Sequence, residues 1–150
     1  MVAAVKTYTD WSIAALESAI SENPGESLNN VIRFWLSSIK QNDIGQGIGM
    51  QLDFYSEATR NDKIREAMLY SQNATHEKLI GLIKHDQQVG VIDAGLDPLS
   101  VARAIMGMVF GIMIHKSLEP DVDLDAYGQV CGAMIKGTFS GPPERQRKKN

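Results

Sequence analysis

Apolar residues recur along most of the chain at intervals of three and four, the spacing that is typical of one face of a helix. After the break at Pro24-Gly25, one predicted face carries Leu28, Val31, Ile32, Trp35 and Ile39, with Phe34 and Leu36 widening it. We find no sustained apolar–polar alternation and no Asn-Gly or Asp-Gly turn of the kind that predicts hairpins. The pattern therefore predicts an all-α chain of six helices, one of them long.

Turn and cap signals set the expected limits of the first helices. Pro-Gly at residues 24–25 ends the first helix, and Ser27 is a suitable N-cap for the second. Residues 42–49 contain three glycines, which indicates either a loop or a loose helix start. A short helix is expected to follow over residues 50–61.

The longest predicted helix begins after a cap at Asn61-Asp62 and runs to about Gln88, with Gly90 as a good stop signal. Asp97 followed by Pro98 is an N-cap and N1 pair that starts the next helix well. The last helix is expected to cover residues 124–139.

The stretch SVARAIMGMVFGIMIHK, residues 100–116, is strongly apolar and raises the question of a membrane span. Between Val101 and Ile114 the only charged residue is Arg103, but this run is about 14 residues long. A transmembrane helix needs about 20, so we predict no membrane span. The side with Ala102, Ile105, Val109 and Ile112 is expected to anchor the core of the domain.

Two pairs of glycines four residues apart lie in the last two predicted helices: Gly107 with Gly111, and Gly128 with Gly132. Each glycine in a helix interior costs about 1 kcal/mol relative to alanine. A pair on one face, however, lets another backbone approach closely. The spacing leaves two interpretations open: close packing of helices within the chain, or a symmetric four-helix interface between two chains.

The composition is that of an ordinary soluble protein, with 150 residues, 43% of them hydrophobic, and a net charge of -3. It favours a single domain and lacks the overall basic charge of a nucleic-acid binder. The single cysteine, Cys131, excludes an intrachain disulfide and fits a cytoplasmic protein, as does the lack of a visible secretory signal. The basic residues 141–150 are expected to form a disordered tail.

Motifs that carry catalysis or bind cofactors are missing from the sequence. It contains no G-x-x-x-x-G-K-[ST] phosphate loop, no H-E-x-x-H zinc pair, no Glu-x-x-His di-iron motif and no G-x-S-x-G nucleophile elbow. We therefore expect no enzyme activity, no bound metal and no cofactor.

Bulky, soft apolar side chains remain, spread over four predicted helices, together with polar side chains on the long helix. A few polar groups in an otherwise apolar cleft are typical of a small-molecule site. The predicted ligand contacts are Trp35, Met50, Phe54, Met68, Gln72, Thr75, His76 and Met108. A core that the same side chains fill completely is the alternative interpretation.

Three segments, LDFYSEATRNDKIREAM, GLDPLSVARAIMGMVFGIMIH and LEPDVDLDAY, resemble in order the C-terminal, effector-binding domain of the tetracycline-repressor (TetR) family of bacterial transcription regulators. Gly111 matches the central helix glycine of that family, and Asp97-Pro98 matches its helix start. The resemblance implies a homodimer in which the last two helices form a four-helix bundle, with an effector cavity enclosed by the earlier helices. The implied interface residues are Met106, Gly107, Phe110, Gly111, Met113, Gly128, Cys131, Gly132 and Ile135.

Members of that family begin with a helix-turn-helix DNA-binding domain, to which nothing before Trp11 corresponds. We therefore expect residues 1–140 to form an isolated regulatory domain that does not bind operator DNA by itself. The implied function is to sense a hydrophobic or amphipathic small molecule as a dimer in the cytoplasm. The alternative is a helical dimerisation module with a filled core and no ligand.

Overall fold

The computed structural model describes residues 27–41 and 44–135, together with residues 3, 6, 7, 9, 10, 13, 14 and 16–18 of the first segment. The described residues of the first segment are helical, and five helices follow: α2 Ser27–Gln41, α3 Ile44–Ala58, α4 Asp62–Gln88, α5 Pro98–Leu118 and α6 Leu124–Ile135. No strand occurs among the described residues, so the all-α prediction is confirmed. The predicted end of the last helix at Phe139 and the predicted tail lie outside them.

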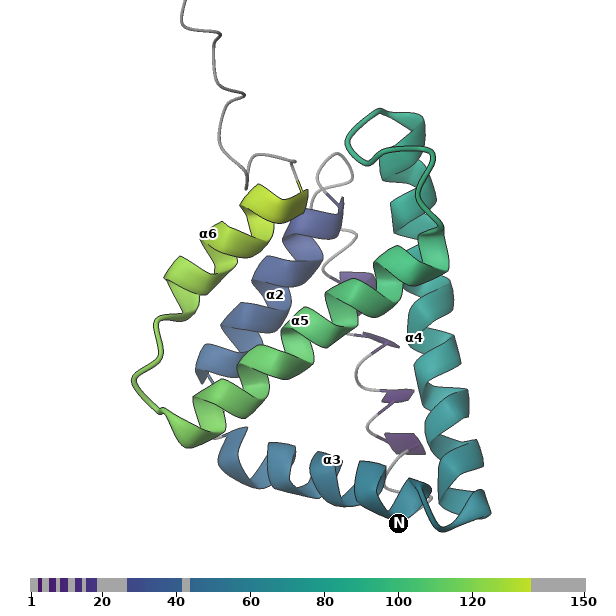
Figure 1. The fold of residues 1–150 in the computed structure, drawn as a ribbon, viewed down its shortest axis with the longest axis vertical. Helices are drawn as coiled ribbons and strands as arrows, with labels where there is room; N and C mark the ends of the chain where they lie inside the picture. The colour runs from purple at the N-terminus through teal and green to yellow at the C-terminus, as the bar shows by residue number, and fades with distance from the viewer. Residues whose placement is uncertain are drawn as a thin grey trace, which may run out of the picture.

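Helices α3, α4 and α5 are arranged as the three sides of a triangle (Figure 1). α4 is the longest side. The end of α3 meets the first turn of α4, and α5 crosses from the end of α4 towards the start of α3. α2 and α6 lie side by side, and α2 also contacts α4 and α5. The first segment is tied to α4 by an ion pair between Glu17 and Lys78.

Side chains at the helix ends confirm the predicted caps. The Asn61 side chain accepts hydrogen bonds from the backbone N–H groups at the start of α4, including that of Ile64 at 3.4 Å. Asp97 caps α5 in the same way, because its Oδ2 accepts from the Ser100 N–H at 2.8 Å. Beyond α4, Gly90 has a φ of 78°, a left-handed conformation that glycine adopts without steric cost.

The glycine-rich stretch that follows α2 is helical, since α3 begins at Ile44 and continues to Ala58. Of the two alternatives that the sequence left open, the helix start is the one observed. Glycine is a poor helix former, but helices in proteins are stabilised mainly by packing. α3 as a whole contacts both α4 and α5, and such contacts favour the helix despite its glycines.

The core is formed mainly by α2, α4 and α5, and it contains the predicted side of α5. Ala102, Ile105 and Ile112 are at most 2% exposed, and Val109 packs against the same cluster. On α2, Leu36, which we expected only to widen the apolar face, is itself buried at 8% exposure. The other buried members of the cluster are Leu16, Leu28, Val31, Ile32, Ile39, Leu79, Leu82, Ile83, Ile92, Leu124 and Cys131.

Helix α5 is 21 residues long, so by length and composition it could cross a membrane. The core helix of a soluble protein has the same properties, and α5 contacts α2, α3, α4 and α6. However, only 22% of its most apolar 18-residue window is buried within the chain. Most residues of this apolar helix are therefore only partly buried by the other described residues.

Candidate functional site

Uncharged polar side chains of α3 and α4 meet beside α5. Gln72 Nε2 donates a hydrogen bond of 3.0 Å to the Tyr55 hydroxyl, and both side chains are half-buried. The Tyr55 ring also contacts the Phe110 ring of α5 edge to face, with 5.2 Å between the ring centroids. This contact fixes the tyrosine between the two neighbouring helices, so that its hydroxyl is presented to Gln72.

A second polar contact joins α4 to the first segment. Thr9, which is 1% exposed, donates from Oγ1 to Ser71 Oγ at 2.6 Å. One turn further along α4, the hydroxyl of the buried Thr75 donates to the Ser71 carbonyl oxygen at 3.2 Å. The face of α4 that carries Ser71 and Thr75 therefore lies towards the interior of the domain.

His76 is half-buried on α4, and its surroundings favour the neutral imidazole. Burial lowers the pKa of His76, and the positive charge of Arg103 on α5 lowers the pKa further. The hydrogen-bonding groups of this part of the interior are therefore uncharged: they are Tyr55, Gln72, Thr75 and the neutral imidazole of His76.

The predicted ligand contacts fall into three groups. Phe54 and Thr75 are buried at 8% exposure, whereas Met50 is 45% exposed on α3. Trp35 and Met108 are half-buried and pack against the main core cluster. The remaining three, Met68, Gln72 and His76, are half-buried along α4. Tyr55 and Phe110 were missing from the predicted contacts, although Tyr55 directly follows Phe54 in the sequence.

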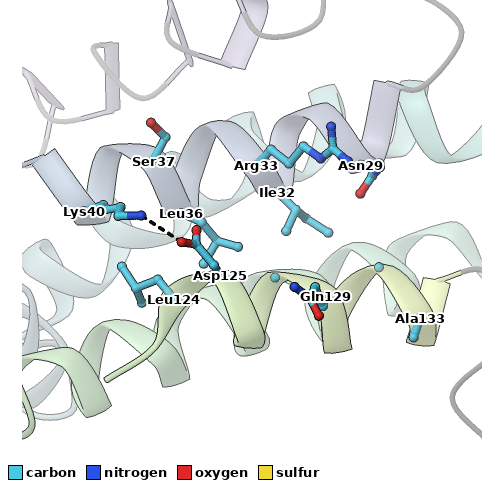
Figure 2. Close-up of a pocket in the computed structure, with 12 residues that line it drawn as sticks. Asn29, Ile32, Arg33, Leu36, Ser37, Lys40, Leu124, Asp125, Gln129 and Ala133 are labelled. Carbon is cyan, nitrogen blue, oxygen red and sulfur yellow. Dashed lines mark hydrogen bonds and ion pairs between the residues drawn. The ribbon is translucent and has the colours of Figure 1, made fainter. Parts of the chain in front are cut away.

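A separate groove of about 610 Å³ runs between α2 and α6. The α2 residues that line it are Asn29, Ile32, Arg33, Leu36, Ser37 and Lys40. Those of α6 are Leu124, Asp125, Gly128, Gln129, Gly132 and Ala133. Figure 2 shows Lys40 and Asp125 joined across one end of the groove, with Asn29 and Ala133 towards the other.

The groove has polar edges and a floor in which glycines replace side chains. Lys40 Nζ and Asp125 Oδ2 are 2.9 Å apart, and the carboxylate raises the pKa of Lys40. Both side chains are well exposed, at 60% and 77%, so this ion pair contributes little to stability. A Cβ atom added to Gly128 would lie 2.9 Å from Leu36 Cδ1, which means that α2 and α6 approach each other closely there.

The two glycine pairs thus have different surroundings. A Cβ atom added to Gly107 or Gly111 on α5 would meet nothing within 4 Å. By contrast, Gly128 faces Leu36, and a Cβ atom on Gly132 would lie 3.8 Å from Asn29 Oδ1. On α6, close packing within the chain is therefore observed at Gly128.

The other predicted interface residues are partly covered by their own chain. Cys131 is 3% exposed in the core, and burial raises the pKa of its thiol. Phe110 contacts Tyr55, as described above. Met106, Met113 and Ile135 are half-buried against the core cluster. Their role in a dimer stays a prediction.

Tyr127 connects α6 to α5. Its hydroxyl donates to the Met108 carbonyl oxygen at 2.7 Å, and burial raises the pKa of Tyr127 to about 12. On the outer side of α6, Val130 and Met134 are 44% and 48% exposed, four residues apart. This helix therefore presents two partly exposed apolar side chains on one face.

The polar edge of the groove was missed from the sequence. Asn29, Arg33 and Ser37 repeat every four residues on α2, which could have indicated a polar stripe beside the apolar face. What the sequence could not indicate is that the glycines of α6 would face this stripe.

The fold is an all-helical domain with an apolar helix left partly uncovered and polar groups between α3, α4 and α5. Residues 24–140 match the family model of the BetI-type transcriptional repressor C-terminal domain. The chain belongs to this family, as the resemblance to TetR regulators predicted. Comparison with the curated proteins and with the solved structures gives no significant match.

Membership in this family identifies the chain as a regulatory domain of a transcriptional repressor, a class of domain that is not an enzyme class. Regulators of the TetR type are typically cytoplasmic, dimerise, and bind effectors and DNA.

Proposed function

We propose that this domain senses an uncharged or weakly polar amphipathic small molecule between α3, α4 and α5, and that it acts as a homodimer through α5 and α6. The observation that carries the proposal is the hydrogen-bonded pair Tyr55–Gln72 at an apolar junction of three helices. A small number of fixed polar groups in apolar surroundings orients a ligand, while apolar burial supplies most of the affinity.

The origin of the side chains at this junction, which come from three different helices, supports its choice as the ligand site. Phe54 and Tyr55 come from α3, Gln72 and Thr75 from α4, and Phe110 from α5, so a ligand there would contact three helices at once. A ligand that binds one arrangement of these helices better than another shifts the population towards it. The junction is therefore suited to convert binding into a movement of α5, the helix that we assign to the interface.

The uncovered apolar surface supports the dimer. Gly107 and Gly111 leave α5 open to close approach, and α6 exposes Val130 and Met134. Both helices would bury these groups against their twofold mates in a four-helix arrangement.

A thermal-shift experiment with decan-1-ol and related neutral amphipathic compounds tests the sensing role. We expect at least one compound to raise the Tm of the wild-type domain, and Gln72→Leu to reduce that shift. Asn73→Leu, a similar change at the neighbouring exposed position of α4, serves as the control and should leave the shift unchanged. If no compound stabilises the wild type while the dimer persists, the domain is a dimerisation module with a filled core.

Sedimentation velocity tests the dimer. A wild-type domain that sediments as a monomer at micromolar concentration would contradict the proposed interface on α5 and α6.

A further inference from the structure

The link between α4 and α5, residues 89–97, begins with a tight turn that is anchored in the core. The Asp86 carbonyl oxygen accepts from the N–H groups of both Val91 and Ile92, at 2.8 and 3.2 Å. Gly90 has the left-handed conformation that is common directly after a helix. Ile92 is 7% exposed and belongs to the core cluster. The first half of the link is therefore held by burial as well as by hydrogen bonds.

The second half of the link, residues 93–97, is held by hydrogen bonds alone, because all five of its residues are exposed. Gln87, in the last turn of α4, donates from Nε2 to the carbonyl oxygen of Asp93 at 2.9 Å and to that of Leu96 at 2.8 Å. Asp93 Oδ1 in turn accepts from the Gly95 N–H at 2.8 Å. A side-chain amide has two N–H groups, so Gln87 uses its full donor capacity on this half of the link.

The two hydrogen bonds of Gln87 tie α4 to the start of α5. Leu96 directly precedes Asp97, whose side chain caps α5. Figure 1 shows the link looping back beside the end of α4 before it enters α5. The two helices also contact each other directly, but packed helices can shift against each other by roughly 1–2 Å. Hydrogen bonds that join the end of one helix to the start of the next resist such a shift.

We propose that Gln87 makes the α4–α5 link a rigid elbow, through which the end of α4 and the start of α5 move as one body. Gln87 lies outside both the proposed ligand contacts and the proposed interface, so it is a positioning residue. The role of the elbow in signalling rests on the proposed function: a ligand that moves α4 at Gln72 and Thr75 would also move α5, the proposed interface helix. A flexible link would absorb that movement.

Amide hydrogen exchange of the full chain, followed by NMR, tests the elbow without any ligand. In Gln87→Leu, the amides of Gly95 and Leu96 should exchange about tenfold faster or more, because two hydrogen bonds that hold this half of the link are lost. Gln88→Leu, the same substitution at the neighbouring exposed residue of α4, is the matched control and should leave these rates unchanged. Equal rates in Gln87→Leu and the wild type would overturn the proposal.

A second comparison measures whether the elbow couples the two helices. Asp97→Ala removes the cap of α5. If the two helices are one body at this end, the amides in the last turn of α4 should also exchange about threefold faster or more. With Gln87→Leu already present, the same cap removal should change exchange within α5 only. Asn61→Ala, which removes the cap at the other end of α4, is the control for a general loss of stability.

An effect of Asp97→Ala that stays within α5 in the otherwise wild-type protein would overturn the coupling, as would an equal effect on α4 with and without Gln87.

Decan-1-ol, the probe of the neutral site, separates failure of the elbow from failure of the proposed function. It should raise the Tm of Gln87→Leu as much as that of the wild type, because the proposed ligand contacts are unchanged. In the wild type it should also change the dimer dissociation constant by about fivefold or more, and in Gln87→Leu this change should be lost. Sedimentation velocity measures the dissociation constants.

The same change of the dissociation constant in both proteins would overturn the role of the elbow in signalling. No rise in the Tm of the wild type would count against the ligand site, and hydrogen exchange would still decide whether the elbow exists.

Discussion

Two pairs of glycines with the same four-residue spacing have opposite surroundings in this domain. On α6, Gly128 lies so close to α2 that an added Cβ atom would meet Leu36 at 2.9 Å. On α5, added Cβ atoms at Gly107 and Gly111 would meet nothing within 4 Å. Gly128 of the first pair therefore packs closely against another helix of the same chain, whereas neither glycine of the second pair does.

The difference matters because glycine in a helix interior carries a cost of about 1 kcal/mol wherever it lies. For Gly128, close packing of α2 on α6 offsets that cost. For Gly107 and Gly111, no described residue of the chain supplies an offsetting contact. This difference supports our proposal that the outer face of α5 contacts a second copy of the chain, as does the small buried share of this apolar helix.

The largest expected effect comes from placing a charge on the open face of α5. Gly107→Lys should weaken the dimer by more than about a hundredfold, because an unpaired ammonium would be buried in the interface. Sedimentation velocity over a range of concentrations measures this loss. Gly81→Lys is the matched control, because Gly81 is also an exposed helical glycine with nothing within 4 Å of its added Cβ atom. If both variants remain dimeric, α5 is not the interface.

Alanine at the inward glycine should have a smaller effect and act on folding. In Gly128→Ala, the new methyl group meets the buried Leu36, and overpacking of this kind costs about 1–3 kcal/mol. The gain in helix propensity, about 1 kcal/mol, opposes that cost. Gly81→Ala has only the gain and should raise the free energy of unfolding.

Urea denaturation at one protein concentration measures the difference between these two variants. Equal stabilisation of both by alanine would show that α2 and α6 do not pack closely at Gly128.

The inner side of α5 provides the third test. Tyr55→Phe removes the hydroxyl that accepts from Gln72 but keeps the ring that contacts Phe110. The expected loss is about 1 kcal/mol in the free energy of unfolding, the typical net value of one hydrogen bond. Tyr70→Phe, at a tyrosine that is 66% exposed, should change little. A loss of the same size in both variants would remove the evidence for a fixed polar pair.

The smallest effect should be a pH dependence of the free energy of unfolding, which arises from His76 on α4. Burial and Arg103 hold the pKa of His76 below its ordinary value of 6.5. Below that pH the unfolded chain binds more protons than the folded one, so the free energy of unfolding decreases as pH falls. The contribution is fully present above pH 6.5 and is lost as pH falls through the lowered pKa.

His76→Gln should flatten this part of the stability profile, and His115→Gln, at an exposed histidine in the last turn of α5, is the control. Urea midpoints measured at a series of pH values test this difference. An unchanged slope in His76→Gln would show that the imidazole is not desolvated.

Much of the fold follows from local signals. Asn61, Asp97 and Gly90 mark helix limits through bonds and backbone angles that involve only neighbouring residues, and all three were predicted. The core side of α5 was predicted because burial follows the helical period. The start of α3 remained open, because its glycines favour a loop locally and only contacts with α4 and α5 favour the helix.

The candidate sites could be predicted less well. Gln72 and Thr75 were proposed from their place on the long helix, but the partner of Gln72, Tyr55, lies 17 positions earlier, on another helix. The polar edge of the groove, which includes Arg33, was not predicted at all, because its place beside the glycines of α6 depends on how two helices distant in the sequence pack together.

By itself, the sequence determined the helical class, the caps, the apolar faces and the resemblance to its family, since each depends on residues within a few turns of one another. The tertiary structure alone decided which glycine pair faces α2 and which faces outward. Both pairs have the same spacing, so the local pattern is identical. The difference arises from the direction in which each helix packs, and that direction is set by contacts between segments far apart in the chain.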